Sequence, residues 1–255
     1  MNSIYGPVAS WRLGRSLGVD LICSEEKICS FNCLYCQLEK TKKISKQREL
    51  FVSVNRLIKE LSVALKKTTS DVITLSGTGE PTLAKNLDEV IQMIRELSKL
   101  PIAILTNSTL LNDKFVRDSL SKIDIIIAKL DAPNQEIFQT VNRPLKEISF
   151  QQTINGIKKM KEEFTGKFAL QMMFIKENKD YASDLAELAR EINPDEVQIN
   201  TPLRPCPVQP LSKTELERIE KEFTGLNTLS VYNSTKPKTD PLDKLEIFKR
   251  RRLVR

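Results

Sequence analysis

Apolar residues in this chain follow two alternating patterns: short continuous runs, and longer stretches in which they recur every three or four residues. Continuous apolar runs rich in β-branched residues are typical of strands that are covered on both faces of a sheet. The runs predict six buried strands, at residues 18–23, 71–76, 101–105, 123–130, 167–175 and 195–200.

The stretches between these runs have the spacing of amphipathic helices. One apolar stripe is formed by Leu57, Leu61, Ala64 and Leu65, and others predict helices near 87–97, 112–121, 149–164 and 180–192. Strands that alternate with helices form right-handed βαβ units and a parallel sheet. The pattern therefore predicts an α/β fold, and by itself it allows either an open doubly wound sheet or a partial barrel.

The sequence changes character after the sixth predicted strand. A proline-rich stretch is followed by a predicted helix at 212–224, a short strand at 228–232 and a charged helix from about 241. We interpret residues 1–205 as the core of the protein. Residues 206–255 are then a small C-terminal α/β extension packed on that core, ending in a basic tail.

Composition indicates an ordinary globular protein. The chain has 255 residues, of which 40% are hydrophobic, and no apolar stretch approaches the ~20 residues that a membrane span requires. Its five cysteines are an odd number, and there is no secretory segment. These features disfavour a disulfide framework and predict a reducing, cytoplasmic location with no membrane partner.

Three cysteines carry the strongest chemical signal. Cys29, Cys33 and Cys36 have the spacing C-x3-C-x2-C, in a chain without any histidine. Three thiolates can hold three irons of a [4Fe-4S] cluster and leave the fourth iron open to a ligand that is not protein. A structural zinc site that adds Cys23 is the alternative, although zinc sites usually pair two C-x2-C units. Cys206 reads as an isolated thiol or as a redox group near the site.

Two more polar motifs follow the next two predicted strands. The loop Ser76–Thr82 (SGTGEPT) contains Gly79 and Glu80, and Thr106-Asn107 ends the third strand. Loops at the carboxyl ends of parallel strands share one edge of a sheet, so these motifs predict one pocket beside the cysteines. Together with the cysteine spacing, this order over residues 18–205 resembles the partial (β/α)6 barrel of radical S-adenosylmethionine (SAM) enzymes.

This resemblance implies cofactors and site residues. Cys29, Cys33 and Cys36 would bind the cluster, and SAM would complete the open iron. Reduction, by an electron donor such as a flavodoxin or ferredoxin, would then cleave SAM to a 5'-deoxyadenosyl radical. The residues implied in SAM binding are Tyr35 against the adenine, Gly79 and Glu80 at the methionine amino group, and Asn107, Asp131 and Gln171 at other polar groups.

A narrower resemblance concerns the opening YGPVASWRLGRSLGVDLICSEEKICSFNCLYCQLEK, the loop SGTGEPTL and the phrase VNRP at 141–144. These segments are similar to the branch that includes the wyosine-tRNA synthases, which implies a tRNA substrate. The synthases carry three further cysteines upstream, whereas only Cys23 precedes the motif here. We therefore expect membership of the branch without the wyosine reaction.

Positive charge is concentrated in two places. The formal net charge is +7, and segments 40–48 (KTKKISKQR) and 249–255 (KRRRLVR) contain no acidic residue. Local basic clusters are typical of surfaces that bind polyanions, which supports an RNA partner. A solvated loop and a basic terminus explain them equally. Arg12 and Arg15 are either two further phosphate contacts or parts of a glycine-containing turn.

The leading hypothesis is a radical SAM enzyme that modifies tRNA. Two alternatives stay open: a radical SAM enzyme acting on a metabolite or peptide, and a non-catalytic protein that binds zinc or nucleic acid.

Overall fold

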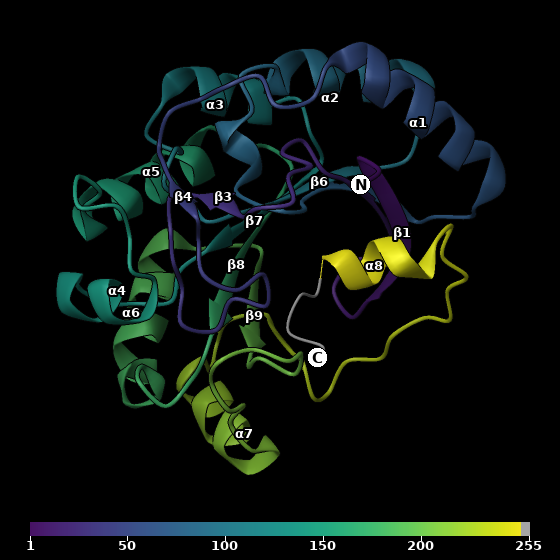
Figure 1. Cartoon of the computed structure of the whole chain (residues 1–255). Helices are drawn as coiled ribbons and strands as arrows, with labels where there is room; N and C mark the ends of the chain where they lie inside the picture. Colours follow the sequence, from purple (N-terminus) through teal and green to yellow (C-terminus); the bar gives the residue numbers. More distant parts are fainter. Residues whose placement is uncertain (251–255) are drawn as a thin grey trace.

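The computed structural model describes residues 1–250 and is built on one curled sheet of eight strands (Figure 1). The order across the sheet is β1-β2-β5-β6-β7-β8-β9-β10. Only β1 runs antiparallel to its neighbour. The strands are β1 (Ile4–Ser10), β2 (Gly14–Val19), β5 (Val72–Leu75), β6 (Ile102–Thr106), β7 (Ile125–Lys129), β8 (Lys167–Met173), β9 (Glu196–Asn200) and β10 (Thr228–Ser230). This curled, largely parallel sheet confirms the predicted α/β fold and partial barrel.

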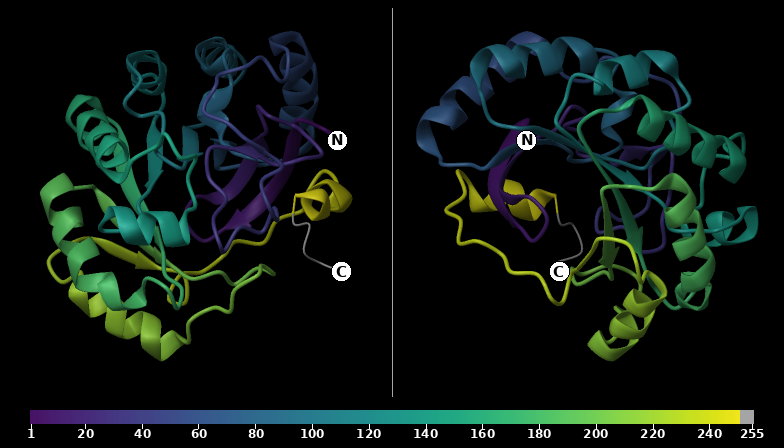
Figure 2. Two further views of the ribbon diagram at one scale, coloured as in Figure 1. Left: turned by 60° about the vertical axis from the view of Figure 1, so that its left-hand side comes forward. Right: turned by 180° about the vertical axis from the view of Figure 1, so that it is seen from behind.

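Helices cover the outer, convex face of the sheet (Figure 2). Their apolar stripes face inward: in α1, for example, Leu57, Leu61 and Ala64 are buried, and the Ser53 side chain caps the first turn. The helices are α1 (Val54–Lys67), α2 (Leu87–Leu97), α3 (Lys114–Leu120), α4 (Gln135–Val141), α5 (Phe150–Glu163), α6 (Ala182–Ile192), α7 (Lys213–Glu222) and α8 (Lys244–Lys249), with 3-10 turns η1 (Pro81–Leu83) and η2 (Lys179–Tyr181). Within residues 1–250 no helix is long and apolar enough to cross a membrane.

The first predicted strand, 18–23, is displaced. The strand is β2, which ends at Val19, and the apolar residues after it lie in a loop. The buried Asp20 carboxylate accepts hydrogen bonds from the backbone amides of Ile22 (3.1 Å) and Cys23 (2.8 Å). These amides are therefore unavailable to a sheet ladder, and Cys23 has a φ of 43°. The reading of Cys23 as a strand residue was wrong.

The C-terminal region completes the sheet. β10 pairs in parallel with β9, so the sheet continues past residue 206. The chain then crosses the open side of the curl toward β1, where α8 packs (Figure 2). The Leu242 amide donates to the Gly6 carbonyl at 2.7 Å. The two edges of the curled sheet are thereby linked by the segment 233–250.

Candidate functional site

The cysteine loop follows β2 and lies against the next loop of the sheet. Its short strand β3 (Ile28–Cys29) pairs in parallel with β4 (Lys43–Ile44), and Ile28 also forms a bridge with Gly79. Cys29, Cys33 and Cys36 all line one cavity of about 420 Å³, a size typical of small-molecule sites. The structure therefore brings the three predicted ligands to one space.

The fourth cysteine of the zinc alternative lies elsewhere. Cys23 is not part of the cavity wall; its thiol lies against the Met1 carbonyl (3.5 Å) and Arg56 (3.7 Å). Among residues 1–250, no three Cys, Asp or Glu side chains are grouped so as to hold a metal ion. The cysteines therefore do not form a site for a single zinc ion.

Lys27 faces the cysteine loop and was missed in the sequence. Its side chain is 3% exposed. Burial lowers its pKa, but the nearby thiols of Cys36, Cys29 and Cys33 outweigh burial, so the pKa is raised and Lys27 stays cationic. Burial also raises the pKa of Cys29 to about 12, an effect that Lys27 opposes. A fixed positive charge here offsets the negative charge of clustered thiolates.

Glu80 ties the tips of β5 and β6 together. It is 2% exposed, and its Oε1 accepts hydrogen bonds from the Thr82 amide (3.1 Å), the Thr82 hydroxyl (2.7 Å) and the Thr106 hydroxyl (2.8 Å). Among the described residues, the one donor to its Oε2 is the Asn107 amide, at 2.7 Å. Burial raises its pKa in spite of these donors. Oε2 therefore keeps room for one more donor, such as an amine.

The two glycines of this loop are required by the chain itself. A Cβ on Gly79 would stand 1.9 Å from the Ile28 carbonyl oxygen, and one on Gly77 would stand 2.0 Å from Asp20 Cγ. Both contacts are far inside van der Waals range. The glycines thus allow the cysteine loop and the SGTGEP loop to touch, and this contact sets the position of Glu80 beside Cys29.

Tyr35 lines the cavity with a fixed hydroxyl. The hydroxyl donates a short hydrogen bond to Asp131 Oδ2, which also accepts from Asn142 Nδ2 at 2.7 Å. Asp131 Oδ1 accepts from the Met173 amide at 2.8 Å. Asp131 is buried and is not part of the cavity wall. Of the predicted residues, it is the one that lies behind the site, where it positions Tyr35.

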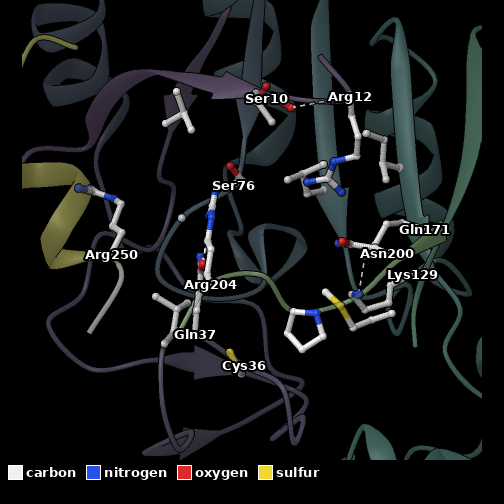
Figure 3. Close-up of a pocket in the computed structure, with 18 of the residues that line it drawn as sticks. Ser10, Arg12, Cys36, Gln37, Ser76, Lys129, Gln171, Asn200, Arg204 and Arg250 are labelled. Carbon is white, nitrogen blue, oxygen red and sulfur yellow. Dashed lines mark hydrogen bonds between the residues drawn. The ribbon is translucent and has the colours of Figure 1, made fainter. Parts of the chain in front are cut away.

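The two predicted amides reach the cavity from β6 and β8. Asn107 Nδ2 donates to Ser30 Oγ (2.8 Å) and lies 3.4 Å from Cys29 Sγ. Gln171 Oε1 accepts from Lys129 Nζ at 2.5 Å (Figure 3). Its buried Nε2 has no hydrogen-bond partner in the part of the chain that the structure describes. An unpaired buried donor in a cavity wall is costly unless a ligand satisfies it.

The structure describes all of the first basic segment and the beginning of the second. In 40–48, Lys43 pairs with Glu49 (2.7 Å) and Arg48 donates to the Ala84 carbonyl (3.2 Å), which leaves Lys40, Lys42 and Lys46 exposed. Residues 251–255 lie outside the described part of the chain.

Arg250, the second residue of the second basic segment, is buried. It pairs with Glu246 at 3.0 Å and Asp20 at 3.3 Å, and stacks 4.2 Å from the Tyr5 ring centroid. Its charge is therefore already neutralised by protein. Arg15 is likewise paired, with Asp71 at 2.6 Å.

The model of the radical SAM superfamily matches residues 27–189 of this chain. The chain belongs to the radical SAM superfamily. A UPF0026 protein of Synechocystis is 44% identical over 208 residues, which cover 81% of this chain and 78% of that protein. The predicted superfamily is confirmed, and with it a protein of the radical SAM enzyme class, which uses SAM and an iron–sulfur cluster. The non-catalytic alternative is not supported.

Solved structures of other radical SAM proteins share the fold. Streptococcus suis SuiB bound to the precursor peptide SuiA has a TM-score of 0.67 at 16% identity, covering 86% of this chain and 49% of SuiB, so this chain spans about half of SuiB's length. Archaeal TYW1 has a TM-score of 0.51 at 16% identity, covering 84% of this chain and 72% of that chain. These likenesses concern the fold alone.

The residues of this radical SAM protein suit the cofactors of its family. Three thiols share a cavity with a buried cation, Lys27. Cys23 is not part of the wall of this cavity. The cavity wall also holds the unpaired Gln171 Nε2 and the singly bonded Glu80 Oε2. The donor set thus fits a three-thiolate cluster and a neighbouring ligand with both amine and acceptor groups.

Proposed function

We propose that this protein binds a [4Fe-4S] cluster through Cys29, Cys33 and Cys36 and reductively cleaves SAM. The observation that carries the proposal is the convergence of three thiols, without Cys23, on one cavity. When bound, the cluster supplies the electron that splits SAM into methionine and a 5'-deoxyadenosyl radical. A flavodoxin or ferredoxin is the proposed class of electron donor.

The protein's own side chains bind and orient in this scheme. Glu80 Oε2 accepts from the methionine amine beside Gly79, and Tyr35, held by Asp131, presents its ring to the adenine. Asn107 and Gln171 provide amide groups along the same wall. Lys27 balances the charge of the thiolates. The apolar neighbours Phe31, Leu38 and Leu105 exclude water, which protects a radical from side reactions.

Anaerobic reconstitution tests this proposal. The wild-type protein should hold about four irons and four sulfides, and with dithionite it should release 5'-deoxyadenosine and methionine from SAM. Cys29→Ala, Cys33→Ala and Cys36→Ala should each abolish both properties, whereas the matched controls Cys23→Ala and Cys206→Ala should retain them. Stoichiometric zinc with no iron would refute the proposal.

The tRNA substrate is a second, finer candidate. It is supported by the exposed Lys40, Lys42 and Lys46 beside the cysteine loop. Contacts to phosphates release counterions, so tRNA affinity should fall steeply with salt. Lys42→Gln with Lys46→Gln should weaken binding and flatten this salt dependence, whereas Lys66→Gln with Lys67→Gln, at the end of α1, should not. If tRNA fails to bind at low salt, a metabolite or peptide substrate is favoured instead.

A further inference from the structure

Arg12 is a cation in the cavity wall that none of the functions above uses. It lies in the turn between β1 and β2, and Figure 3 shows its side chain reaching into the cavity, whose opposite end holds Cys36. Its neighbour Trp11, the single tryptophan of the chain, has its ring centroid 5.2 Å from the guanidinium carbon.

Within residues 1–250, the guanidinium of Arg12 has no hydrogen-bond or ion-pair partner. No acceptor of the described chain hydrogen-bonds or ion-pairs with it, and its Nε is fully buried without a partner. Burial, reinforced by the charge of Arg204, lowers the pKa of Arg12 to about 10. The nearby acid Glu196 is engaged by Lys167 at 2.8 Å and by Gln198 at 2.8 Å. The residue as a whole is partly exposed, but a charge whose Nε is buried and unpaired is unfavourable unless a ligand brings an anion.

The rest of the cavity wall also has an excess of positive charge. Its charged side chains are a single carboxylate, Glu80, and six cations: Arg12, Lys27, Lys129, Arg204, Lys236 and Arg250. Arg250 is paired with Asp20 and Glu246, and Lys129 lies 3.6 Å from Asp131. Gln171 adds the unpaired amide donor on the same wall. Lys27 is offset by the thiolates of the same cavity, but the end at Arg12 still offers donors and positive charge, which suit an occupant with acceptors and negative charge.

The place of Arg12 separates it from the cluster end. The cysteine loop follows the carboxyl end of β2, whereas Arg12 precedes its amino end. A six-residue strand spans about 17 Å at roughly 3.3 Å per residue. An anionic group at Arg12 is therefore distinct from the SAM methionine group at the cysteine loop.

We propose that the end of the cavity at Arg12 binds the carboxylate or phosphate group of a small-molecule substrate. This inference rests on the function proposed above, because the same cavity would hold SAM at its other end. The planar guanidinium, pre-oriented against Trp11, presents paired donors that match a carboxylate or phosphate.

Trp11 fluorescence tests the proposal on the reconstituted, anaerobic holoprotein. The probes are acetate, inorganic phosphate and pyrophosphate at constant ionic strength, with acetamide as the neutral analogue of acetate. At least one oxyanion should change the emission saturably, and acetamide should not. Acetate and phosphate distinguish a carboxylate from a phosphate substrate. If no oxyanion acts, or if tRNA alone does, the small-molecule proposal is overturned.

Variants identify the residue. Arg12→Met should weaken oxyanion binding at least about tenfold, as expected for a lost charge-assisted hydrogen bond, and Arg12→Lys should retain part of it. The matched control Arg218→Met, on α7, should bind like the wild type. Equal oxyanion binding by Arg12→Met and the wild type would overturn the assignment. If Arg12→Met does not fold, Arg12→Lys takes its place: oxyanion binding equal to that of the wild type would then overturn the assignment.

The two proposals fail separately. Iron content and SAM cleavage of the wild type test the cluster, whereas the oxyanion titration requires no turnover. Saturable oxyanion binding that depends on Arg12, in a protein that never holds iron, would refute the proposed function and leave the anion site standing.

Discussion

Glu80 should be a major contributor to stability as well as a candidate ligand for SAM. Glu80→Ala removes the acceptor of four donors, of which the Thr82 and Asn107 amides are fixed by the backbone. Each buried donor left unpaired costs about 1–3 kcal/mol, so the two amides alone predict a loss of about 2–6 kcal/mol. For a chain of this size, that corresponds to a fall in Tm of roughly 5–20 °C.

Urea unfolding of the wild type and of Glu80→Ala measures this loss. Glu80→Gln keeps the volume and one carbonyl acceptor, so it should fall between them, and Glu89→Ala, an exposed acid on α2, should match the wild type. Because burial raises the pKa of Glu80, the folded state takes up a proton at this carboxyl more readily than the unfolded state does. The advantage of the wild type over Glu80→Ala should therefore grow as pH falls toward the ordinary value of 4.5.

Binding of SAM is the second measurement on the same variant. At a temperature well below the Tm of Glu80→Ala, the lost charge-assisted hydrogen bond should weaken SAM binding about 10- to 150-fold. If Glu80→Ala unfolds within about 0.5 kcal/mol of the wild type, the four-donor network carries no stability and our reasoning is wrong. If stability falls but SAM affinity does not, Glu80 holds the two loops together and does not meet SAM.

Three further predictions address the cysteine loop and a distant ion pair. Gly79→Ala should lower the free energy of unfolding by about 1–3 kcal/mol, because its Cβ would clash with Ile28; unchanged urea unfolding would contradict this. Lys27→Met should lower the cluster midpoint potential by about 100 mV, since a nearby unit charge contributes roughly 2–3 kcal/mol, and an EPR redox titration without such a shift would argue against it. The Glu215 pKa is lowered to about 2 by Lys179, so this ion pair stabilises the fold above pH 4.5, and the stabilisation is lost as pH falls toward 2. Glu215→Gln should make the free energy of unfolding depend less on pH between 4.5 and 2, as measured by urea unfolding.

The parallel strands were predictable because they are buried on both faces, and continuous apolar runs record that burial. Strand β1 was missed because its sequence, IYGPVAS, mixes glycine and proline with half-exposed positions and has no clear period. The shift of β2 depended on a side-chain interaction of Asp20 with the following amides. Apolar periodicity contains no information about such hydrogen bonds.

The candidate site was predictable where spacing determines chemistry. Cys29, Cys33 and Cys36 are close in sequence, so their convergence follows from a single loop. Lys27 and Arg12 were different, because the burial of a basic side chain depends on segments that are distant in sequence.

Asp131 illustrates a third limit of the sequence. It does lie just past the end of β7, as its position indicated. Past a strand end, however, the alternation of faces stops, and its side chain points behind Tyr35 instead of into the cavity.

The link between the two ends of the described chain has a consequence for biosynthesis. The Asn2 amide donates to Glu246 at 3.0 Å, and Arg250 donates to the Asn2 carbonyl, across a separation of 248 residues. The first contact cannot form before residue 246 has left the ribosome, and the second cannot form before residue 250 has. During translation, the β1 edge and the wall that bears the cysteines therefore remain uncovered on that side. Because Glu246 and Arg250 are synthesised after every strand of the sheet, we expect closure of the curl to follow the pairing of the parallel strands.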